Sequence, residues 1–369
     1  MTDDERLYRI ALNAVPFIGP MIYHRLVAAF GSAGDVFRAQ PDSLKGVEGV
    51  YENLARKIVQ ANPLKTAARE VELAQKTGVT IVLLGEECYP VPLRNAYSPP
   101  PVLYIKGKWE EADTVSIAVV GTRRPTAYGK LMAERLVEGL TKAGLTVVSG
   151  LARGVDAIAH RAAIAAGGRT VAALGCGVNI IYPPEHRELQ ESICGHGAVV
   201  SQFPFAAAPD KMNFPMRNRI ISGLSLGTLV IEAAEKSGAL ITAYAAIDDN
   251  RDVFALPGPV NSQNSAGTNK LIKRGHAKLV QGVEDILDEL PDYVRSAMAS
   301  RQASLPLETE EKIEGEELMV IEAMGPEALH IDIISQMCGL PSNMVSAILL
   351  TLELKGKVKQ MPGKLFIAG

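Results

Sequence analysis

The sequence predicts an α/β protein built around a doubly wound parallel sheet, with an all-helical domain before it and a winged helix after it. From about residue 76 to 290, short β-branched runs such as VSIAVV and GTLVIEA alternate with helical stretches. Several of these runs end in glycine followed by polar or basic residues. Such alternation is typical of a parallel sheet covered by helices on both faces, where ligands bind beyond the carboxyl ends of the strands. We therefore expect these loops to share one crevice.

Length and composition indicate a globular protein of more than one domain. The chain has 369 residues, of which 47% are hydrophobic, and a formal net charge of −3. At about 150 residues per domain this length favours two or three domains, and the composition excludes a disordered or histone-like chain. The net charge of the chain therefore does not indicate a class of binding partner. Four scattered cysteines and an acidic start, MTDDERLYRI, predict a cytoplasmic protein with buried thiols and without a metal, a cofactor or a membrane span.

Residues 1–75 have helical spacing and predict an all-helical domain. Two turns, in VPFIGPMIYHRLV and LKGVEGVYENLARKI, place glycines between apolar helical segments. This is the pattern of a helix-hairpin-helix, in which backbone N–H groups at a helix start can meet a phosphate. The cations closest to these glycines are His24, Arg25 and Lys45. A helical packing module is therefore favoured over a DNA clamp.

Beyond residue 290 the sequence predicts a linker and a winged helix. Residues 291–315 gain Ser, Pro and acidic residues, and residues 316–369 read as three helices and a closing hairpin, KVKQMPGKLFIA. The expected recognition helix, NMVSAILLTLELKG, has its cation only at the end, and the hairpin adds three lysines. Because acidic residues outweigh these cations, we expect a protein-contact module or a weak nucleic-acid accessory rather than a strong duplex reader.

The first basic junction follows the run VSIAVV, in the segment GTRRPTAYG. Gly121 allows a tight turn and Thr122 offers a hydroxyl. Arg123 and Arg124 supply positive charge beside an expected helix start, whose free N–H groups can face the same ligand. The segment is neither G-x-G-x-x-G nor a P-loop, so it indicates a phosphate site but not a dinucleotide site.

The next junction, VVSGLARGVD, repeats the arrangement one unit later with Ser149, Gly150, Arg153 and Gly154. On the helix that follows, Asp156 lies four residues before His160, a spacing that suits an acid/base pair. Asp156 also falls in the first helical turn, where a carboxylate offsets the helix dipole, and no nucleophile stands beside the pair. A structural role for these two residues is therefore favoured.

Two later junctions add more cations and an aromatic ring. FPMRNRIISG contains Phe214 and two arginines, and NSAGTNKLIKRG contains three cations after Gly267. One arginine at a strand end is usually a surface charge or a carboxylate partner. Four such junctions on one sheet edge favour a phosphate chain as the ligand, with the ring as a stacking face. The predicted nucleic-acid-binding residues are Gly121, Thr122, Arg123, Arg124, Ser149, Gly150, Arg153, Gly154, Phe214, Arg217, Asn218, Arg219, Asn269 and Lys270.

Seven segments between residues 89 and 275 carry a family resemblance. They are YPVPLRNAYSPPPVLYIKG, GTRRPTAYG, SGLARGVDAIAHRAA, LGCGVNIIYPPEHREL, FPMRNRIISGLS, EAAEKSGALITA and LPGPVNSQNSAGTNKLI. With them the chain resembles the bacterial DNA-processing protein A (DprA/Smf) family. Relatives often carry Ser-Glu in the loop that reads SQFP here, so a role of that glutamate does not transfer to Gln202.

The resemblance implies an extended Rossmann fold with a SAM-like domain before it and an optional winged helix after it. It also implies a homodimer that binds single-stranded DNA, protects incoming strands and helps load the RecA recombinase during natural transformation. The strand-binding roles that it implies fall on Arg123, Arg153, Arg217, Asn218, Arg219 and Lys270.

The main alternative is a nucleotide-processing enzyme of the phosphoribohydrolase type, which uses a Gly-Gly-x-Gly-Thr-x-x-Glu loop. The segment LSLGTLVIE approaches that pattern, but Leu224 and Ser225 replace the leading glycines. Glu232 also lies one position too far from Thr228, which turns it to the other face of a strand. An interaction scaffold built on the helical termini explains neither the arginines nor the glycine-rich loops. We therefore predict a DNA-binding protein and no enzyme.

Overall fold

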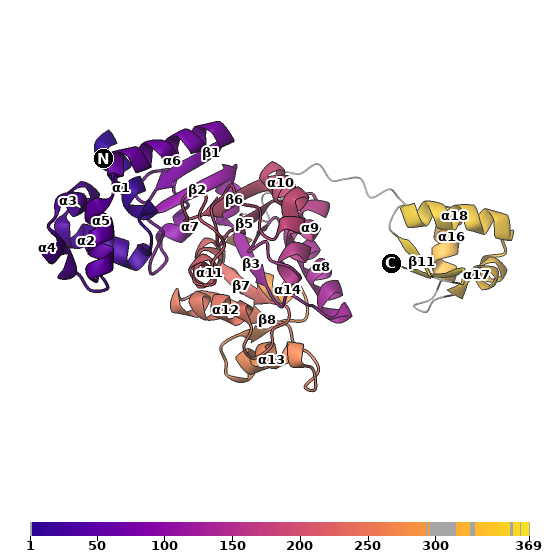
Figure 1. Cartoon of the computed structure of the whole chain (residues 1–369). Coiled ribbons are helices and arrows are strands. Elements are labelled where there is room, and N and C mark those ends of the chain that lie inside the picture. The colour runs from indigo at the N-terminus through magenta and orange to yellow at the C-terminus, as the bar shows by residue number, and fades with distance from the viewer. Residues whose placement is uncertain are drawn as a thin grey trace. The chain divides into compact units, whose positions relative to one another are not determined.

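The computed structural model describes residues 2–292, 294–295, 315–324, 329–354, 357–361 and 363–368. The chain divides into two compact units, Met1–Ala303 and Ser304–Gly369 (Figure 1). Most of the predicted linker, residues 291–315, lies outside the described residues. The predicted boundary at residue 75 between a helical domain and a sheet domain stays a prediction.

Six helices precede the sheet. Their bounds are α1 Asp3–Ala14, α2 Pro20–Phe30, α3 Ala33–Arg38, α4 Pro41–Lys45, α5 Glu52–Gln60 and α6 Pro63–Thr77. The hydroxyl of Thr2 caps α1, and α6 ends at Gly78, whose φ of 65° suits a residue without Cβ. Leu12, Leu26 and other apolar side chains of α1 to α5 form a core of their own. The all-helical start is therefore confirmed.

The sheet of the first unit has nine strands in the order β1-β2-β6-β5-β4-β3-β7-β8-β9. Their bounds are β1 Val79–Leu83, β2 Val102–Gly107, β3 Ser116–Val120, β4 Thr146–Ser149, β5 Thr170–Ala173, β6 Gly197–Ser201, β7 Gly227–Val230, β8 Asp252–Ala255 and β9 Lys278–Leu279. From β6 to β9 all neighbours are parallel, and β5-β4-β3-β7-β8-β9 has the 3-2-1-4-5-6 order of a Rossmann fold. The predicted doubly wound sheet is confirmed.

The edge beyond β6 corrects one detail of the sequence-based prediction. The run VTIVLL, expected among the parallel strands, is β1, and it pairs antiparallel with β2. β2 pairs antiparallel with β6 as well. β2 lies in the segment PPPVLYIKG, for which no strand is predicted. Since β1 and β2 are joined by less than twenty residues that include α7 (Val91–Arg94), they form a connected antiparallel pair rather than a crossover unit.

Helices cover both faces of this sheet. Side chains alternate along β3, so Ala118 and Val120 face the core under α7, α11 (Asn213–Leu224) and α12 (Gly238–Asp248). Ile117 and Val119 face the opposite core. The second face is covered by α8 (Ala127–Lys142), α9 (Val155–Ala165) and α14 (Glu284–Leu287), and further along the sheet by α10 (Arg187–His196), α1 and α6. The remaining elements of the unit are η1 Glu111–Thr114, η2 Pro184–His186, η3 Gln263–Ser265 and α13 Ala266–Lys273.

The second unit is a winged helix, as predicted. Its described elements are α16 Glu316–Ala323, β10 Leu329–His330, α17 Ile331–Cys338, α18 Ser342–Leu354, β11 Val358–Met361 and β12 Leu365–Ala368. The predicted recognition helix is α18, and the predicted hairpin is formed by β11 and β12. The backbone N–H of Gln360 binds the Glu353 carboxylate at 3.1 Å and ties the hairpin to this helix. Lys355 lies outside the described residues.

Two composition-based expectations can be compared with the structure. Of the cysteines, Cys176 is buried but Cys88 is exposed, so the expectation of four buried thiols is wrong. In the described part of the chain, no single helix is long and apolar enough to cross a membrane. Helices α17 and α18 taken together have the length and the apolar composition of a membrane span, but they are bent by 106° relative to each other.

Candidate nucleic-acid interface

A crevice opens beyond the carboxyl ends of the parallel strands, where the strand order reverses between β3 and β7. This switch point is where open α/β sheets bind ligands. The crevice contains a cavity of about 270 Å³ beside a smaller one of about 20 Å³. Both cavities are lined by Arg123, Ala152, Phe214 and Arg217, so they form one continuous site.

The Phe214 ring lines both cavities of this crevice and lies near two guanidinium groups. Arg123 lies 5.9 Å and Arg217 5.8 Å from the ring centroid. Tyr182 adds a second aromatic ring, 5.9 Å away and tilted by 35°. The loop after β5 passes directly behind Phe214, since a Cβ at Gly175 would lie 2.8 Å from the ring. The ring is half-buried, so one part is packed and another is open to a ligand.

Arg217 is the buried cation of the site, with 5% of its surface exposed. Its guanidinium donates to the carbonyl oxygens of Gly150 and Ala173, the latter at 2.9 Å. Its Nε has no partner in the protein. Burial lowers the pKa of Arg217. Burial also raises the pKa of the nearby Asp156 carboxyl, and the positive charge of Arg217 opposes this rise. A buried cation with an unused donor favours an anionic or hydrogen-bond-accepting ligand at this position.

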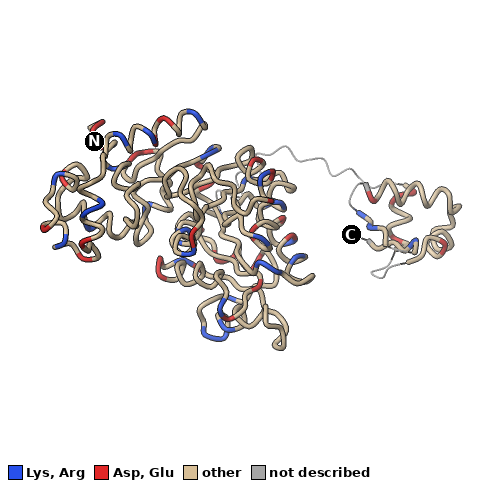
Figure 2. Tube along the Cα trace, in the orientation of Figure 1, with Lys and Arg blue, Asp and Glu red and all other residues tan. Residues whose placement is uncertain are grey.

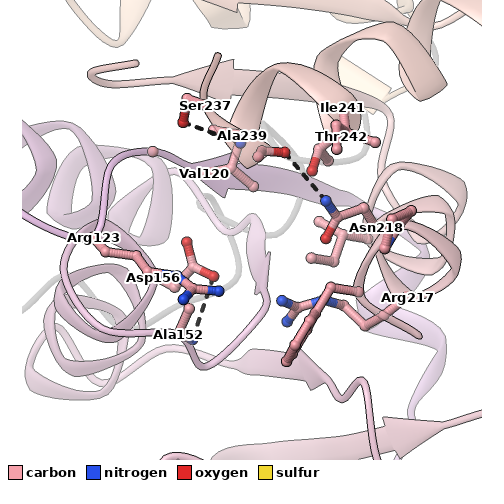
Figure 3. A pocket seen from close by; sticks show the side chains of 15 residues that line it. Val120, Arg123, Ala152, Asp156, Arg217, Asn218, Ser237, Ala239, Ile241 and Thr242 are labelled. Atoms are coloured by element: carbon pink, nitrogen blue, oxygen red, sulfur yellow. Dashed lines mark hydrogen bonds between the residues drawn. The ribbon is translucent and has the colours of Figure 1, made fainter. Parts of the chain in front are cut away.

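Figure 3 shows how these charges are arranged. Arg123 and Arg217 point into the same space from opposite sides, with Asp156 near them. The Asp156 carboxylate accepts a hydrogen bond from the Ala152 N–H at 3.4 Å, consistent with the structural role predicted for it. Arg123 is exposed and comes from the loop after β3, whereas Arg217 comes from inside α11.

Close backbone packing holds the two glycine-containing loops together. The Thr122 N–H donates to the Glu232 carbonyl at 2.7 Å, and the Thr122 carbonyl accepts from Val155 N at 3.2 Å. Gly154 has φ of 78°, and a Cβ there would lie 2.4 Å from the Thr122 carbonyl oxygen. A Cβ at Gly121 would lie 2.6 Å from Val155. These glycines are therefore needed for the approach of the β3 and β4 loops.

Other predicted residues near the crevice have partners within the protein. The Ser149 hydroxyl donates to the Val119 carbonyl at 2.6 Å, beneath the loop. Asn218 donates to the Gly238 carbonyl at 3.2 Å and so joins α11 to α12. Arg153 lines the smaller cavity and forms an exposed ion pair with Glu185.

Besides Thr122, Ser149 and Gly154 in the loops, four predicted residues do not line these two cavities. Arg124 is exposed, and its carbonyl accepts from Asn264. Arg219 forms an ion pair with Asp248 at 3.3 Å and lines different cavities. Lys270 and Asn269 line a separate cavity next to α13. Figure 2 shows blue segments, which mark Lys and Arg, in this part of the chain. Asn269 also binds both backbone groups of Gly258, at 3.2 and 2.9 Å.

The sequence motifs do not reveal the contribution of α12. Ser237, Ala239, Ile241 and Thr242 line the larger cavity. The Thr242 hydroxyl is buried and has no partner in the protein. These residues carry no charge and follow no strand-end arginine in the sequence. Their one signal is the family segment EAAEKSGALITA, for which no site residue is predicted.

Fold and crevice together define a Rossmann-like protein with an arginine-lined cavity at its switch point. The chain belongs to the DNA recombination-mediator protein A family, whose model matches residues 80–291, and a model of the DprA winged helix domain matches residues 302–364. The family predicted from the motifs is confirmed.

Named relatives and solved structures agree with this assignment. Protein Smf of Synechocystis is 34% identical, with 98% of both chains covered. DNA processing protein DprA of Bacillus subtilis is 38% identical over 69% of this chain and 89% of its own. The structure of DNA processing protein A from Streptococcus pneumoniae has a TM-score of 0.65 and 30% identity, covering 79% of this chain and 99% of that one. A structure that describes the single-stranded DNA binding mode of DNA processing protein A from Helicobacter pylori has a TM-score of 0.51 and 30% identity. It covers 60% of this chain and 96% of that one.

Proposed function

We propose that this protein binds single-stranded DNA in the crevice at the switch point. The observation that carries the proposal is the half-exposed Phe214 ring with the guanidinium groups of Arg123 and Arg217 both close to its centroid, at 5.9 and 5.8 Å. Cations that bind phosphates, next to a ring that stacks a base, are the combination that sequence-tolerant single-strand binding uses. The described binding mode of the Helicobacter pylori relative supports the same ligand.

Within this proposal the predicted residues have different roles. Arg123, Phe214 and Arg217 contact the strand in the crevice, and Arg153 binds a phosphate at its edge. Gly121, Thr122, Ser149, Gly150 and Gly154 shape the loops, and Asn218 joins α11 to α12 at the wall of the larger cavity. Arg124, Arg219, Asn269 and Lys270 contact the strand outside the two cavities.

We further propose that the protein acts in the cytoplasm as a homodimer that protects incoming DNA and helps load RecA during natural transformation. The family membership supports this role. Light scattering at tens of micromolar tests the dimer, on the full chain and on residues 1–303. The shorter chain keeps α1 and α6, whose side chains share a core with β1 and β2. A monomer in both samples would contradict a dimer formed by the first unit.

The phosphoribohydrolase alternative is less well supported, because the Glu232 carboxylate is bound to Thr126 at the start of α8 rather than directed to a substrate. We therefore propose a binding protein without catalytic activity.

One titration separates these functions. Fluorescent oligo-dT, duplex DNA of equal length and mononucleotides are each titrated at two salt concentrations. The proposal predicts tight binding of the single strand with a steep salt dependence, because phosphate binding releases counterions. Saturable turnover of a mononucleotide would support the enzyme instead, and preference for the duplex would contradict both.

A further inference from the structure

A second, apolar cavity of about 390 Å³ lies between the N-terminal helices and α11. We call it the aromatic cavity; its walls include Phe17, Tyr97, Met216 and Arg219. Its size falls in the range of about 300–1,000 Å³ typical of small-molecule sites. Phe17 is 78% and Tyr97 76% exposed. Two exposed rings that line one apolar cavity form an apolar patch of the kind that marks an interaction site.

The backbone at this cavity also carries an unusual conformation. Phe17 has φ of 77°, in the left-handed region that bulky residues rarely adopt. Such strain persists where the surrounding structure fixes it, and it is concentrated at functional sites. In this conformation the Phe17 ring is exposed and lines the aromatic cavity.

Hydrogen bonds between sequence-distant segments hold the walls together. Asn13 donates to the Gln202 carbonyl at 3.0 Å, and His24 Nε2 lies 2.8 Å from the Pro99 carbonyl. The Tyr97 N–H binds the Asp249 carboxylate at 2.9 Å. The cavity is therefore preformed by the fold.

Helix α11 connects the aromatic cavity to the crevice. Pro215 lines both the crevice and a third cavity, of about 360 Å³. Met216 and Arg219 line this third cavity and also the aromatic cavity. The three cavities thus follow one another along α11, from Phe214 to the rings of Phe17 and Tyr97.

We propose that the aromatic cavity receives bases of the same single strand after it leaves the crevice, with Phe17 and Tyr97 as stacking faces. Two cations near the rings fit this ligand. Lys57 Nζ lies 3.9 Å from the Phe17 ring centroid. Arg219 lines the wall, and its ion pair with Asp248 compensates part of its charge. The continuity with the crevice favours a nucleic acid over an apolar protein segment. This inference rests on the proposed function.

The test is a series of oligo-dT lengths from about 4 to about 16 nucleotides, the range of site sizes known for single-strand-binding OB folds. The full-length protein is compared with the variant F17A/Y97A. Loss of stacking should weaken the binding of long oligonucleotides by about 5- to 150-fold per base, corresponding to about 1–3 kcal/mol. Oligonucleotides short enough to fill only the crevice should bind both proteins equally. A variant with Tyr97→Phe keeps the ring at this position and should therefore bind long oligonucleotides as tightly as the parent protein does.

Controls separate the possible outcomes. Tyr51→Ala removes a ring that is 78% exposed but does not line the cavity, and it should have no effect at any length. If the parent protein binds long oligo-dT and F17A/Y97A binds it equally well, the aromatic cavity is not on the strand path, although the proposed function stands. A loss that is equal at all lengths would also overturn the inference. If the parent protein binds no oligo-dT, both the inference and the proposed function are wrong.

Discussion

The hydroxyl of Thr126 donates a hydrogen bond to the carboxylate of Glu232, with 2.6 Å between Oγ1 and Oε1. The backbone N–H of Thr126 binds the second carboxylate oxygen at 2.9 Å, and Glu232 is only 3% exposed. The same hydroxyl accepts from Gly129 N at 3.1 Å and caps α8. The residues after β7 therefore hold the start of α8 and, with it, the loop that carries Arg123.

Replacing Glu232 by Ala should lower the free energy of unfolding by about 1–3 kcal/mol, because two donors of Thr126 lose a charged acceptor. Urea unfolding measures this change. Glu235→Ala is the matched control: its carboxylate forms an exposed ion pair with Lys270, so its removal should cost less than about 1 kcal/mol. Equal destabilisation of the two variants would contradict the capping role.

Replacing Arg123 or Arg153 by Ala should weaken oligo-dT binding and reduce the salt dependence. For single strands, the slope of log affinity against log salt should decrease by about 0.7 for each phosphate that the variant no longer binds. Titrations at several salt concentrations measure the slope. Arg56→Ala, which removes an exposed cation on α5, should leave the slope unchanged. Unchanged slopes in both crevice variants would argue against a shared phosphate site.

Phe214→Ala should weaken oligo-dT binding by about 1–3 kcal/mol with little change in the salt slope, because stacking does not release counterions. Phe214→Tyr keeps the ring and should retain most of the affinity. A change in slope as large as that of an arginine variant would show that Phe214 acts by placing Arg123 and Arg217 rather than by stacking.

His160 should make the protein less stable in mild acid. It is fully buried, and the Thr170 hydroxyl that faces its Nδ1 at 2.7 Å donates to the Val147 carbonyl, so Nδ1 carries the proton and Nε2 is an acceptor without a partner. Burial lowers the pKa of His160 to about 3, from 6.5. Between these values the unfolded state binds more protons than the folded state. This contribution to stability is complete above pH 6.5 and is lost as the pH falls toward 3.

Urea unfolding at a series of pH values should therefore include a slope of up to about 1.4 kcal/mol per pH unit from this one residue. His160→Gln should lose that slope, whereas His196→Gln, at an exposed position, should keep it. An unaltered slope in His160→Gln would mean that another group dominates the acid response.

Deleting the winged helix should affect single-strand binding little. Residues 1–303 contain the whole crevice, so their oligo-dT affinity should lie within about tenfold, or roughly 1.4 kcal/mol, of the full chain. The hairpin lysines Lys357, Lys359 and Lys364 are the plausible DNA-binding residues of the second unit. A larger decrease in affinity, or tight duplex binding by residues 304–369 alone at physiological salt, would give the hairpin a stronger role.

The parallel core of the fold was predictable because most of its strands are short runs with β-branched residues that alternate with helical stretches. Strand β2 was not predictable. Its apolar run directly follows three prolines, and it pairs with β6, which lies about a hundred residues later in the sequence. Pairing of that kind depends on the whole sheet and leaves no local signal. The helices at both termini were predictable from their period alone.

The candidate site was predictable in part. The loops of β3 and β4 meet in the crevice as expected, because the carboxyl ends of parallel strands share one edge. The segment FPMRNR, interpreted as a junction, lies inside α11. Residues two apart on a helix differ by about 200° in direction, so Arg217 points into the crevice and Arg219 does not. A linear motif could not separate them without the start of the helix.

The strand order also determines when the sheet can close as the chain is synthesised. Strand β2 lacks its β6 neighbour until Val199 has left the ribosome, and β3 lacks β7 until Gly227 has done so. For the intervening translation time, the antiparallel pair of β1 and β2 and the central strand of the Rossmann core carry open edges. N-terminal helices with a core of their own can fold first, but the crevice is assembled only after more than half of the chain has emerged. An arrest of translation before that point leaves exposed strand edges that are prone to aggregate.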